Sequence, residues 1–116
     1  MYRGDFMDLI ELNNRNLRKF IENNDIVICL IYDKKDVLYH LSRALLKKVK
    51  AFYLMNIKIC QVNKDLFISN YDLFVKLKQY DKMYSQIVVF KNNEMVKILP
   101  NLCKIERVIA DVSPLI

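Results

Sequence analysis

The chain is short of glycine, histidine and paired cysteine, and each shortage excludes a class of function. Gly4 is the only glycine among 116 residues, so no glycine-rich loop can wrap a phosphate group. The three cysteines are widely spaced and form no Cys-x-x-Cys pair, which excludes a zinc ribbon and a dithiol redox motif. One histidine, His40, cannot by itself build a catalytic triad or a common metal site. We therefore expect no catalytic residue, no cofactor and no metal.

Long apolar runs are also missing. No run approaches the roughly 20 residues that a membrane-spanning helix requires, and the first ten residues lack the continuous apolar core of a signal peptide. Cys29 and Cys60 lie inside short apolar runs, as core residues do, and the odd number of cysteines fits a reducing compartment. We expect a single domain over residues 1–116, a cytoplasmic or nuclear location, and no membrane partner.

What the chain does have is apolar side chains and positive charge. Hydrophobic residues make up 53% of the sequence, which is enough for a packed core, and the formal net charge is +6. A basic excess of this kind attracts nucleic acid, acidic lipid or an acidic protein surface, or it belongs to an ordinary lysine-rich surface.

Apolar patterns along the chain predict alternating strands and helices. Residues 26–32 are apolar at every position, which is typical of a strand buried on both faces. Asn92 and Asn93 tolerate the positive φ angles of a tight hairpin. Between residues 51 and 62 the pattern leaves open whether 51–55 or 57–62 forms the strand. We expect strands at 8–12, 26–32, within 51–62, 86–90 and 95–98, and helices from 13 or 14 to 23, from 36 to 50, from 69 or 70 to 80, and from 100 or 101 to 112.

The predicted helix over residues 36–50 has two distinct sides. Asp36 is expected to cap it, because a carboxylate oxygen accepts the unpaired amides of a first turn. Phe52 and Tyr53, just beyond, are expected to face the core. The apolar side, facing the core, is Val37, Leu38, Leu41, Leu45 and Val49, and the polar side is His40, Arg43, Lys47 and Lys50.

The predicted order β-α-β-α-β-α-β-β-α resembles the thioredoxin fold, an α/β fold with a central mixed sheet and helices on both faces. The stretch IVVFKNNEMV, residues 87–96, is similar to the strand, turn and strand of that family. The stretch IELNNRNLRKFIENNDIVICLIYD, residues 10–33, resembles the family's opening strand, helix and central strand. The resemblance extends from about residue 8 to residue 112.

The chain departs from the family at its redox site. The resemblance places Asp36 and Tyr39 at the positions of the two reactive cysteines, and neither side chain attacks a disulfide. It places Ser85 or Gln86 where the family has a cis-proline, so a trans peptide bond is expected there. The resemblance therefore implies a degenerate, non-redox member that is not an enzyme, and a redox or other enzyme is the less favoured alternative.

Degenerate members of this superfamily act as binding modules. The phosducin-like proteins, which the turn at residues 31–36 resembles, are cofactors of the cytosolic chaperonin in the folding of tubulin and actin. This resemblance implies a protein partner, with a chaperonin as the named candidate. The surface expected to contact it is the edge that carries the redox site in relatives, formed by Lys34, Lys35, Asp36, Tyr39, Tyr84 and Ser85.

A second branch, the spliceosomal thioredoxin-like proteins, supports an alternative. In that reading the chain is a ribonucleoprotein component, and Arg43, Lys47 and Lys50 form a basic face that contacts nucleic acid. The aromatic-rich stretch at residues 63–85 is open to two interpretations. It is either a longer helix with ordinary core aromatics or an added surface for a partner.

Overall fold

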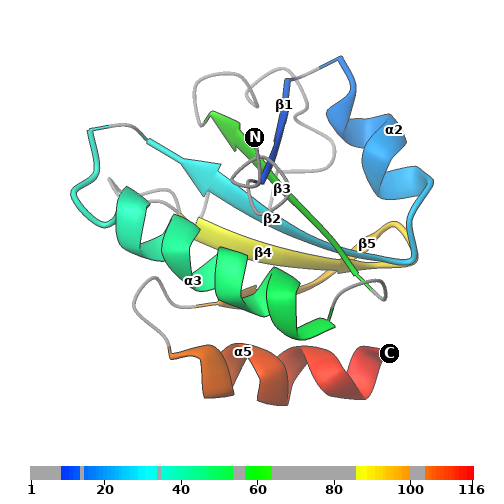
Figure 1. The fold of residues 1–116 in the computed structure, drawn as a ribbon. Helices are drawn as coiled ribbons and strands as arrows, with labels where there is room; N and C mark the ends of the chain where they lie inside the picture. The colour runs from blue at the N-terminus through cyan, green and yellow to red at the C-terminus, as the bar shows by residue number, and fades with distance from the viewer. Residues whose placement is uncertain (1–8, 14, 34, 54–56, 64–85, 100–103) are drawn as a thin grey trace, which may run out of the picture.

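The protein is built on one five-stranded sheet (Figure 1). The computed structural model describes residues 9–13, 15–33, 35–53, 57–63, 86–99 and 104–116. Within them the strand order is β1-β3-β2-β4-β5, with β1, β3 and β2 parallel and with β4 and β5 antiparallel to their neighbours. The elements are β1 (Ile10–Leu12), α2 (Leu17–Glu22), β2 (Ile26–Tyr32), α3 (Tyr39–Tyr53), β3 (Lys58–Asn63), β4 (Gln86–Lys91), β5 (Glu94–Leu99), α5 (Ile105–Val112) and the short 3-10 helix η3 (Ser113–Leu115).

Strand β2 is the centre of the sheet, as predicted. All seven of its residues are buried, because β3 and β4 flank its edges and helices cover both of its faces. Its bounds match the apolar run at residues 26–32. The third strand is Lys58–Asn63, so the ambiguity over residues 51–62 resolves in favour of its second half, while residues 51–53 belong to α3.

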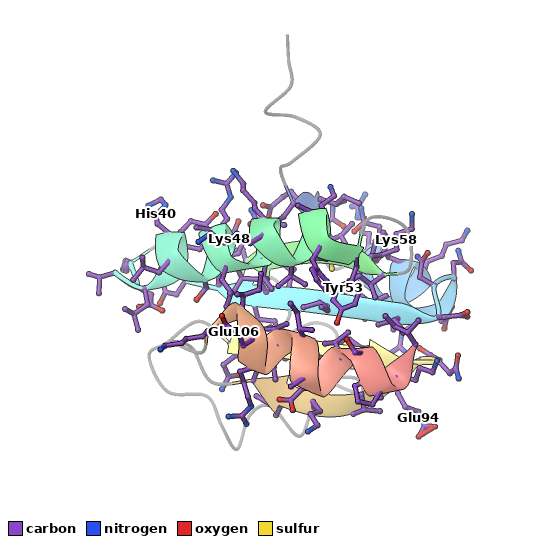
Figure 2. The ribbon with its side chains drawn as sticks, turned by 60° about the horizontal axis from the view of Figure 1, so that its bottom comes forward. His40, Lys48, Tyr53, Lys58, Glu94 and Glu106 are labelled. Carbon is purple, nitrogen blue, oxygen red and sulfur yellow. The ribbon has the colours of Figure 1, made fainter. Side chains whose placement is uncertain are left out.

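Helices cover both faces of the sheet, which confirms the predicted α/β architecture. One face, the α2 face, packs against Leu17 and Ile21 of α2. The other, the α3–α5 face, packs against Leu46 and Val49 of α3 and against the buried residues of α5. Helices α3 and α5 lie side by side on this second face (Figures 1 and 2). The helix predicted from residue 69 or 70 to residue 80 lies outside the described residues.

Helix α2 begins later than predicted. An asparagine does accept backbone amides before it, because Asn13 Oδ1 accepts from the N–H groups of Arg15 and Asn16 at 2.8 and 3.2 Å. These bonds close a turn over residues 13–16 rather than the first turn of the helix, which starts at Leu17. The Asn13 side chain therefore binds backbone amides that the first turn of a helix starting at Asn13 or Asn14 would contain, and α2 starts later.

The prediction of which side of α3 faces the core was right for Val49 and Tyr53, which are buried, and wrong for three other apolar residues. Val37 and Leu41 are 84% and 59% exposed, and Phe52, also predicted to face the core, is 58% exposed. The apolar pattern of α3 contains two overlapping helical stripes, and periodicity cannot choose between them. The structure buries Ser42 and Leu46 in place of Leu41 and Leu45, and it keeps Val49 and Tyr53 in the same buried stripe.

The hairpin between β4 and β5 forms as predicted. Asn92 and Asn93 have φ angles of 50° and 69°, in the left-handed region that asparagine tolerates better than most residues. They form a two-residue loop between the paired residues Lys91 and Glu94. The Asn92 N–H also donates to the Asp25 carbonyl oxygen at 2.8 Å, which ties the hairpin loop to the start of β2.

Helix α5 closes the fold along the α3–α5 face. Tyr53 Oη shares a 2.6 Å hydrogen bond with Ser113 Oγ and donates to the Ile109 carbonyl oxygen at 3.3 Å, so the last turns of α3 and α5 are joined. Pro114 follows directly within η3, where the predicted helix end lies. Within the described ranges, no helix is long and apolar enough to cross a membrane.

Candidate functional site

The turn between β2 and α3 carries most of the predicted contact surface. Lys35 is exposed and Tyr39, the first residue of α3, is half-buried. Asp36, by contrast, is only 8% exposed, although it was expected on the surface. Lys34, Tyr84 and Ser85 lie outside the described residues, as does the peptide bond at Ser85 that was expected to be trans.

Two aspartates fold this turn through their side chains. Asp33 Oδ1 accepts from the Lys35 N–H at 2.9 Å, and Asp36 Oδ1 accepts from the Leu38 N–H at 2.9 Å. The backbone of Asp36 adds two bonds, since its N–H donates to the Asp33 carbonyl and its carbonyl accepts from Tyr39. The carboxylate of Asp36 thus satisfies an amide just before α3, close to its predicted capping role.

A network of polar side chains lies beside this turn on the α3–α5 face. Glu11 of β1 and Gln61 of β3 are direct register partners, and Gln61 Nε2 donates to Glu11 Oε1 at 2.6 Å. Tyr32, the last residue of β2, donates through Oη to Glu11 Oε2 at 2.8 Å. Gln61 Nε2 also donates to Tyr39 Oη at 3.3 Å. The Glu11 network therefore joins three strands to the first residue of α3.

Aromatic stacking completes the Glu11 network. The rings of Tyr32 and Tyr39 stack with centroids 4.6 Å apart, and the exposed His40 ring lies 4.9 Å from that of Tyr39. Burial and the hydrogen bond to Glu11 raise the pKa of the Tyr32 phenol above its ordinary range. Tyr32 is therefore a neutral hydrogen-bond donor at physiological pH and not a nucleophile.

The two described cysteines lie on the opposite side of the sheet from the Glu11 network. Cys29 of β2 and Cys60 of β3 are register partners, and both are fully buried on the α2 face. A hydrogen bond with Cys29, together with burial, raises the pKa of the Cys60 thiol. Cys103 lies outside the described residues. Among the residues that are described, no three His, Cys, Asp or Glu side chains gather closely enough to hold a metal ion.

The predicted basic face of α3 is less open than expected. Arg43, Lys47 and Lys50 are half-buried, and each has an interaction with a neighbouring group. The exposed residues of α3 are a mixed polar and apolar set, listed in chain order as His40, Leu41, Ala44, Lys48, Ala51 and Phe52. Two of the apolar members are side chains that the sequence pattern assigned to the core.

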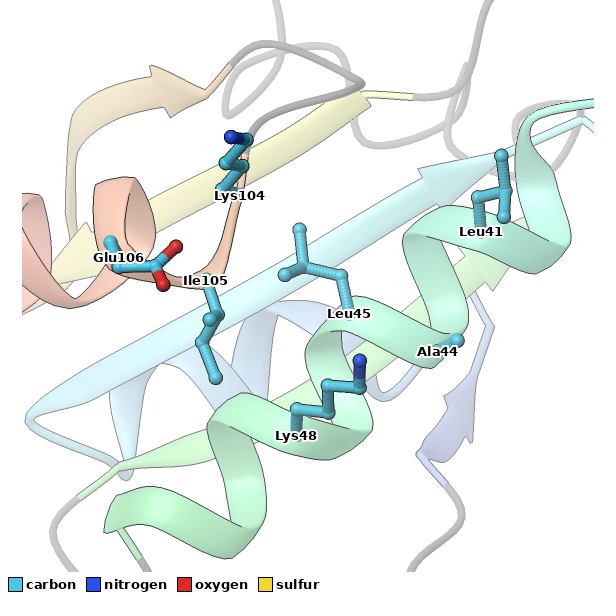
Figure 3. Close-up of a pocket in the computed structure, with 7 residues that line it drawn as sticks. All are labelled: Leu41, Ala44, Leu45, Lys48, Lys104, Ile105 and Glu106. Carbon is cyan, nitrogen blue, oxygen red and sulfur yellow. The ribbon is translucent and has the colours of Figure 1, made fainter.

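An open pocket of about 360 Å³ lies between the first half of α3 and the start of α5 (Figure 3). Leu45 of α3 and Ile105 of α5 point into the space between the two helices. Both are half-buried and rest against the main core. The other lining residues are Leu41, Ala44, Lys48, Lys104 and Glu106.

Neither the Glu11 network nor the pocket was predicted from the sequence. Glu11 and Gln61 are 50 positions apart, and only the register of β1 against β3 brings them together. The signal available in the sequence was that each of these two residues is a polar residue in the interior of a short apolar strand. The pocket was missed because Leu41 and Leu45 were assigned to the core.

Structural comparison places this arrangement among known folds. A mutant thioredoxin from Halobacterium salinarum aligns with a TM-score of 0.75 at 10% identity, over 94% of this chain and 91% of that one. Mitochondrial thioredoxin 3 from Saccharomyces cerevisiae, in its oxidised form, aligns with a TM-score of 0.72 at 13% identity, over 92% and 95%. Thioredoxin f2 from Chlamydomonas reinhardtii gives 0.71 at 19% identity, over 91% and 94%.

Sequence comparison adds nothing to this, because no protein-family model and no curated protein sequence matches the chain. At identities of 10 to 19% the structural likeness describes the fold. It nevertheless covers about nine-tenths of the chain, at TM-scores of 0.71 to 0.75. The chain therefore has a thioredoxin-like fold.

Proposed function

We propose that the chain is a non-catalytic protein-binding module built on the thioredoxin-like fold. The observation that carries this proposal is the content of the turn before α3. Asp36 and Tyr39 stand where the family resemblance places the two reactive cysteines, and both are engaged in the hydrogen bonds that hold the turn. The two described thiols are buried in the sheet, away from this turn.

The contact surface in this proposal is the exposed part of the turn. Lys35 offers an exposed charged side chain, and Tyr39 adds a half-buried aromatic ring. Aromatic side chains are enriched at the centres of protein interfaces, and charged side chains such as that of Lys35 fit the polar rim. The finer form of the proposal is a cofactor of the cytosolic chaperonin, as the resemblance to phosducin-like proteins implies.

Affinity purification with mass spectrometry tests this role. Lys35→Glu reverses one exposed charge in the turn, while Lys19→Glu makes the same change on the exposed side of α2 and serves as the control. We expect Lys35→Glu, and not Lys19→Glu, to remove specific partners. An identical partner set for both variants would refute the assignment of the surface. Co-migration with purified cytosolic chaperonin on a native gel tests the finer form.

An insulin-reduction assay tests the non-catalytic part of the proposal. We expect no turnover above the background of the dithiothreitol reductant, because no thiol occupies the start of α3. Turnover that disappears in Cys29→Ala or Cys60→Ala would show that the buried pair is redox-active and that the proposal is wrong.

A ribonucleoprotein component is the second candidate function. The observation that favours it is the charge of α3, which carries Arg43, Lys47, Lys48 and Lys50 and no acidic residue. Neutralisation of phosphates by such a helix releases counterions, so binding to single-stranded RNA would weaken steeply as the salt concentration rises. Binding that is absent, or indifferent to salt, would exclude this candidate.

A further inference from the structure

Helix α3 presents an apolar stripe that the rest of the described fold leaves uncovered. Leu41, Leu45, Lys48 and Phe52 follow one another at helical spacing along one side. Leu41 and Phe52 are more than half exposed, and Leu45 is half-buried. Val37, four residues before Leu41, extends the apolar surface to the turn and is 84% exposed. Exposed apolar side chains that line up in this way are characteristic of a binding surface.

The stripe runs into the pocket between α3 and α5. Leu41, Ala44, Leu45 and Ile105 form its apolar lining (Figure 3). The two helices are joined at their last turns through Tyr53 and stand apart at their first turns, where the pocket lies. An apolar side chain inserted here would rest on Leu45 and Ile105, which themselves pack on the core.

The charged groups around the pocket favour an acidic ligand. Lys48 of α3 and Lys104 at the start of α5 both line it, and within the described residues neither ammonium group has an ion pair or hydrogen bond. Among the described lining residues Glu106 is the one carboxylate, and it lies in the first turn of α5, where the helix dipole favours it. The remaining charges of α3 are all positive.

We propose that the pocket between α3 and α5 binds an acidic amphipathic helix of a partner protein. One apolar side chain of that helix would enter between Leu41, Leu45 and Ile105, and carboxylates on either side of it would pair with Lys48 and Lys104. This rests on the proposed binding function and adds the chemistry of the partner. A protein ligand fits better than a nucleic acid, because the floor of the pocket is formed by apolar side chains and none of its described lining residues has an aromatic ring on which a base can stack.

A defined peptide tests the pocket directly. The probe is a synthetic 18-residue helix with Leu at positions i, i+4, i+7 and i+11 and Glu at most other positions. It is titrated into the isotopically labelled full chain and followed by amide chemical shifts. We expect the largest shifts at Leu41, Leu45 and Ile105. The same peptide with Ser in place of Leu is expected not to bind.

A matched pair of charge reversals tests the role of the two lysines. Lys48→Glu with Lys104→Glu removes both pocket cations, and Lys19→Glu with Lys58→Glu makes the same change in net charge at exposed sites outside the pocket. We expect the first pair to weaken binding of the peptide by about tenfold and the second by less than about threefold. The first pair should also gain affinity for the Lys-for-Glu version of the peptide.

Several results would overturn the proposal. They are the absence of peptide binding, shifts centred on Lys35 and Tyr39, equal effects of the two charge-reversed pairs, and an oligonucleotide that binds the pocket more tightly than the peptide does. Chemical shift changes centred on Lys35 would refute the pocket as the binding site and would still agree with the proposed function. If the peptide binds in the pocket but Lys35→Glu does not change the set of partners, the pocket is supported as a binding site and the turn is refuted as the contact surface.

Discussion

The two faces of the sheet are covered in different ways. On the α2 face, Leu17 and Ile21 close over an apolar layer in which Cys29 and Cys60 lie side by side, and the buried residues described in this layer are at most 6% exposed. On the α3–α5 face the centre of the core is also buried from solvent. At its margins, however, it carries the Glu11 network at one end of the strands and an open pocket between the two helices.

This difference separates the groups that hold the fold together from those available to a partner. The two described thiols lie on the closed face, where burial keeps them out of reach, and the hydrogen bond with Cys29 together with burial raises the pKa of Cys60. The open face carries the Glu11 network with its stacked tyrosines, and the exposed Leu41 and Phe52 of α3. In this thioredoxin-like fold the polar and aromatic side chains available to a partner lie beside the start of α3, and no thiol lies at the start of that helix.

The largest expected effect comes from opening the closed face. Leu17→Ala removes a fully buried side chain from α2, and we expect it to lower the free energy of unfolding by about 2–5 kcal/mol. Leu41→Ala makes the same chemical change on the open face, where the side chain is 59% exposed, and should cost no more than about 0.5 kcal/mol. Urea unfolding monitored by circular dichroism measures both. Equal losses would mean that the two faces do not differ as described.

The Glu11 network is expected to contribute less than the core. Glu11→Ala removes the acceptor of the Tyr32 hydroxyl and leaves the Gln61 amide only its longer bond to Tyr39 Oη, which we expect to cost about 1–3 kcal/mol. In a Tyr32→Phe background the same change should cost less, because one of the two donors is already gone. Glu22→Ala, an exposed carboxylate of α2, is the control. Additive losses would show that Glu11 and Tyr32 are not coupled.

The smallest effect concerns the thiols. In a Cys103→Ala background, we expect Cys29 and Cys60 to react with Ellman's reagent no faster than the protein unfolds, because both are fully buried and the pKa of Cys60 is raised. Leu17→Ala should accelerate the labelling by opening the face that covers them. Rapid labelling of the native chain would place a reactive thiol where the comparison of the two faces puts none.

Much of the fold could be predicted from local signals. The run at residues 26–32 is apolar at every position, and only a central strand buries both of its sides. Asn92 and Asn93 fix the hairpin because positive φ angles restrict the residues that can stand there. The side of α3 that faces the core was not predictable in the same way. Ser42 is buried and Leu41 is exposed, so the way α3 packs against the sheet, and not the hydrophobicity of each residue, determines which side is buried.

The site was harder to predict than the fold, since it depends on contacts between distant parts of the chain. The turn at residues 33–38 was found because a charged stretch follows a buried strand, and Asp36 does bond an amide there. The acceptor in the adjoining network, Glu11, comes from an edge strand of three residues, and no local pattern relates it to Gln61 or Tyr32. The pairing of β1 with β3 had to be known first.

The position of β2 between two kinds of neighbour has a consequence for how the chain folds. Its parallel partner β3 is the nearer one in sequence, because residues 27–32 pair with residues 58–63. Its antiparallel partner β4 is more distant, because residues 26–31 pair with residues 86–91. The β4–β5 hairpin closes across two residues and can form within about 1–10 μs on its own. Docking it on β2 must close a much longer loop, whose entropic cost grows with its length. Until that docking occurs, β2 has an unpaired edge, and this interval is when the chain is most exposed to pairing with another copy of itself.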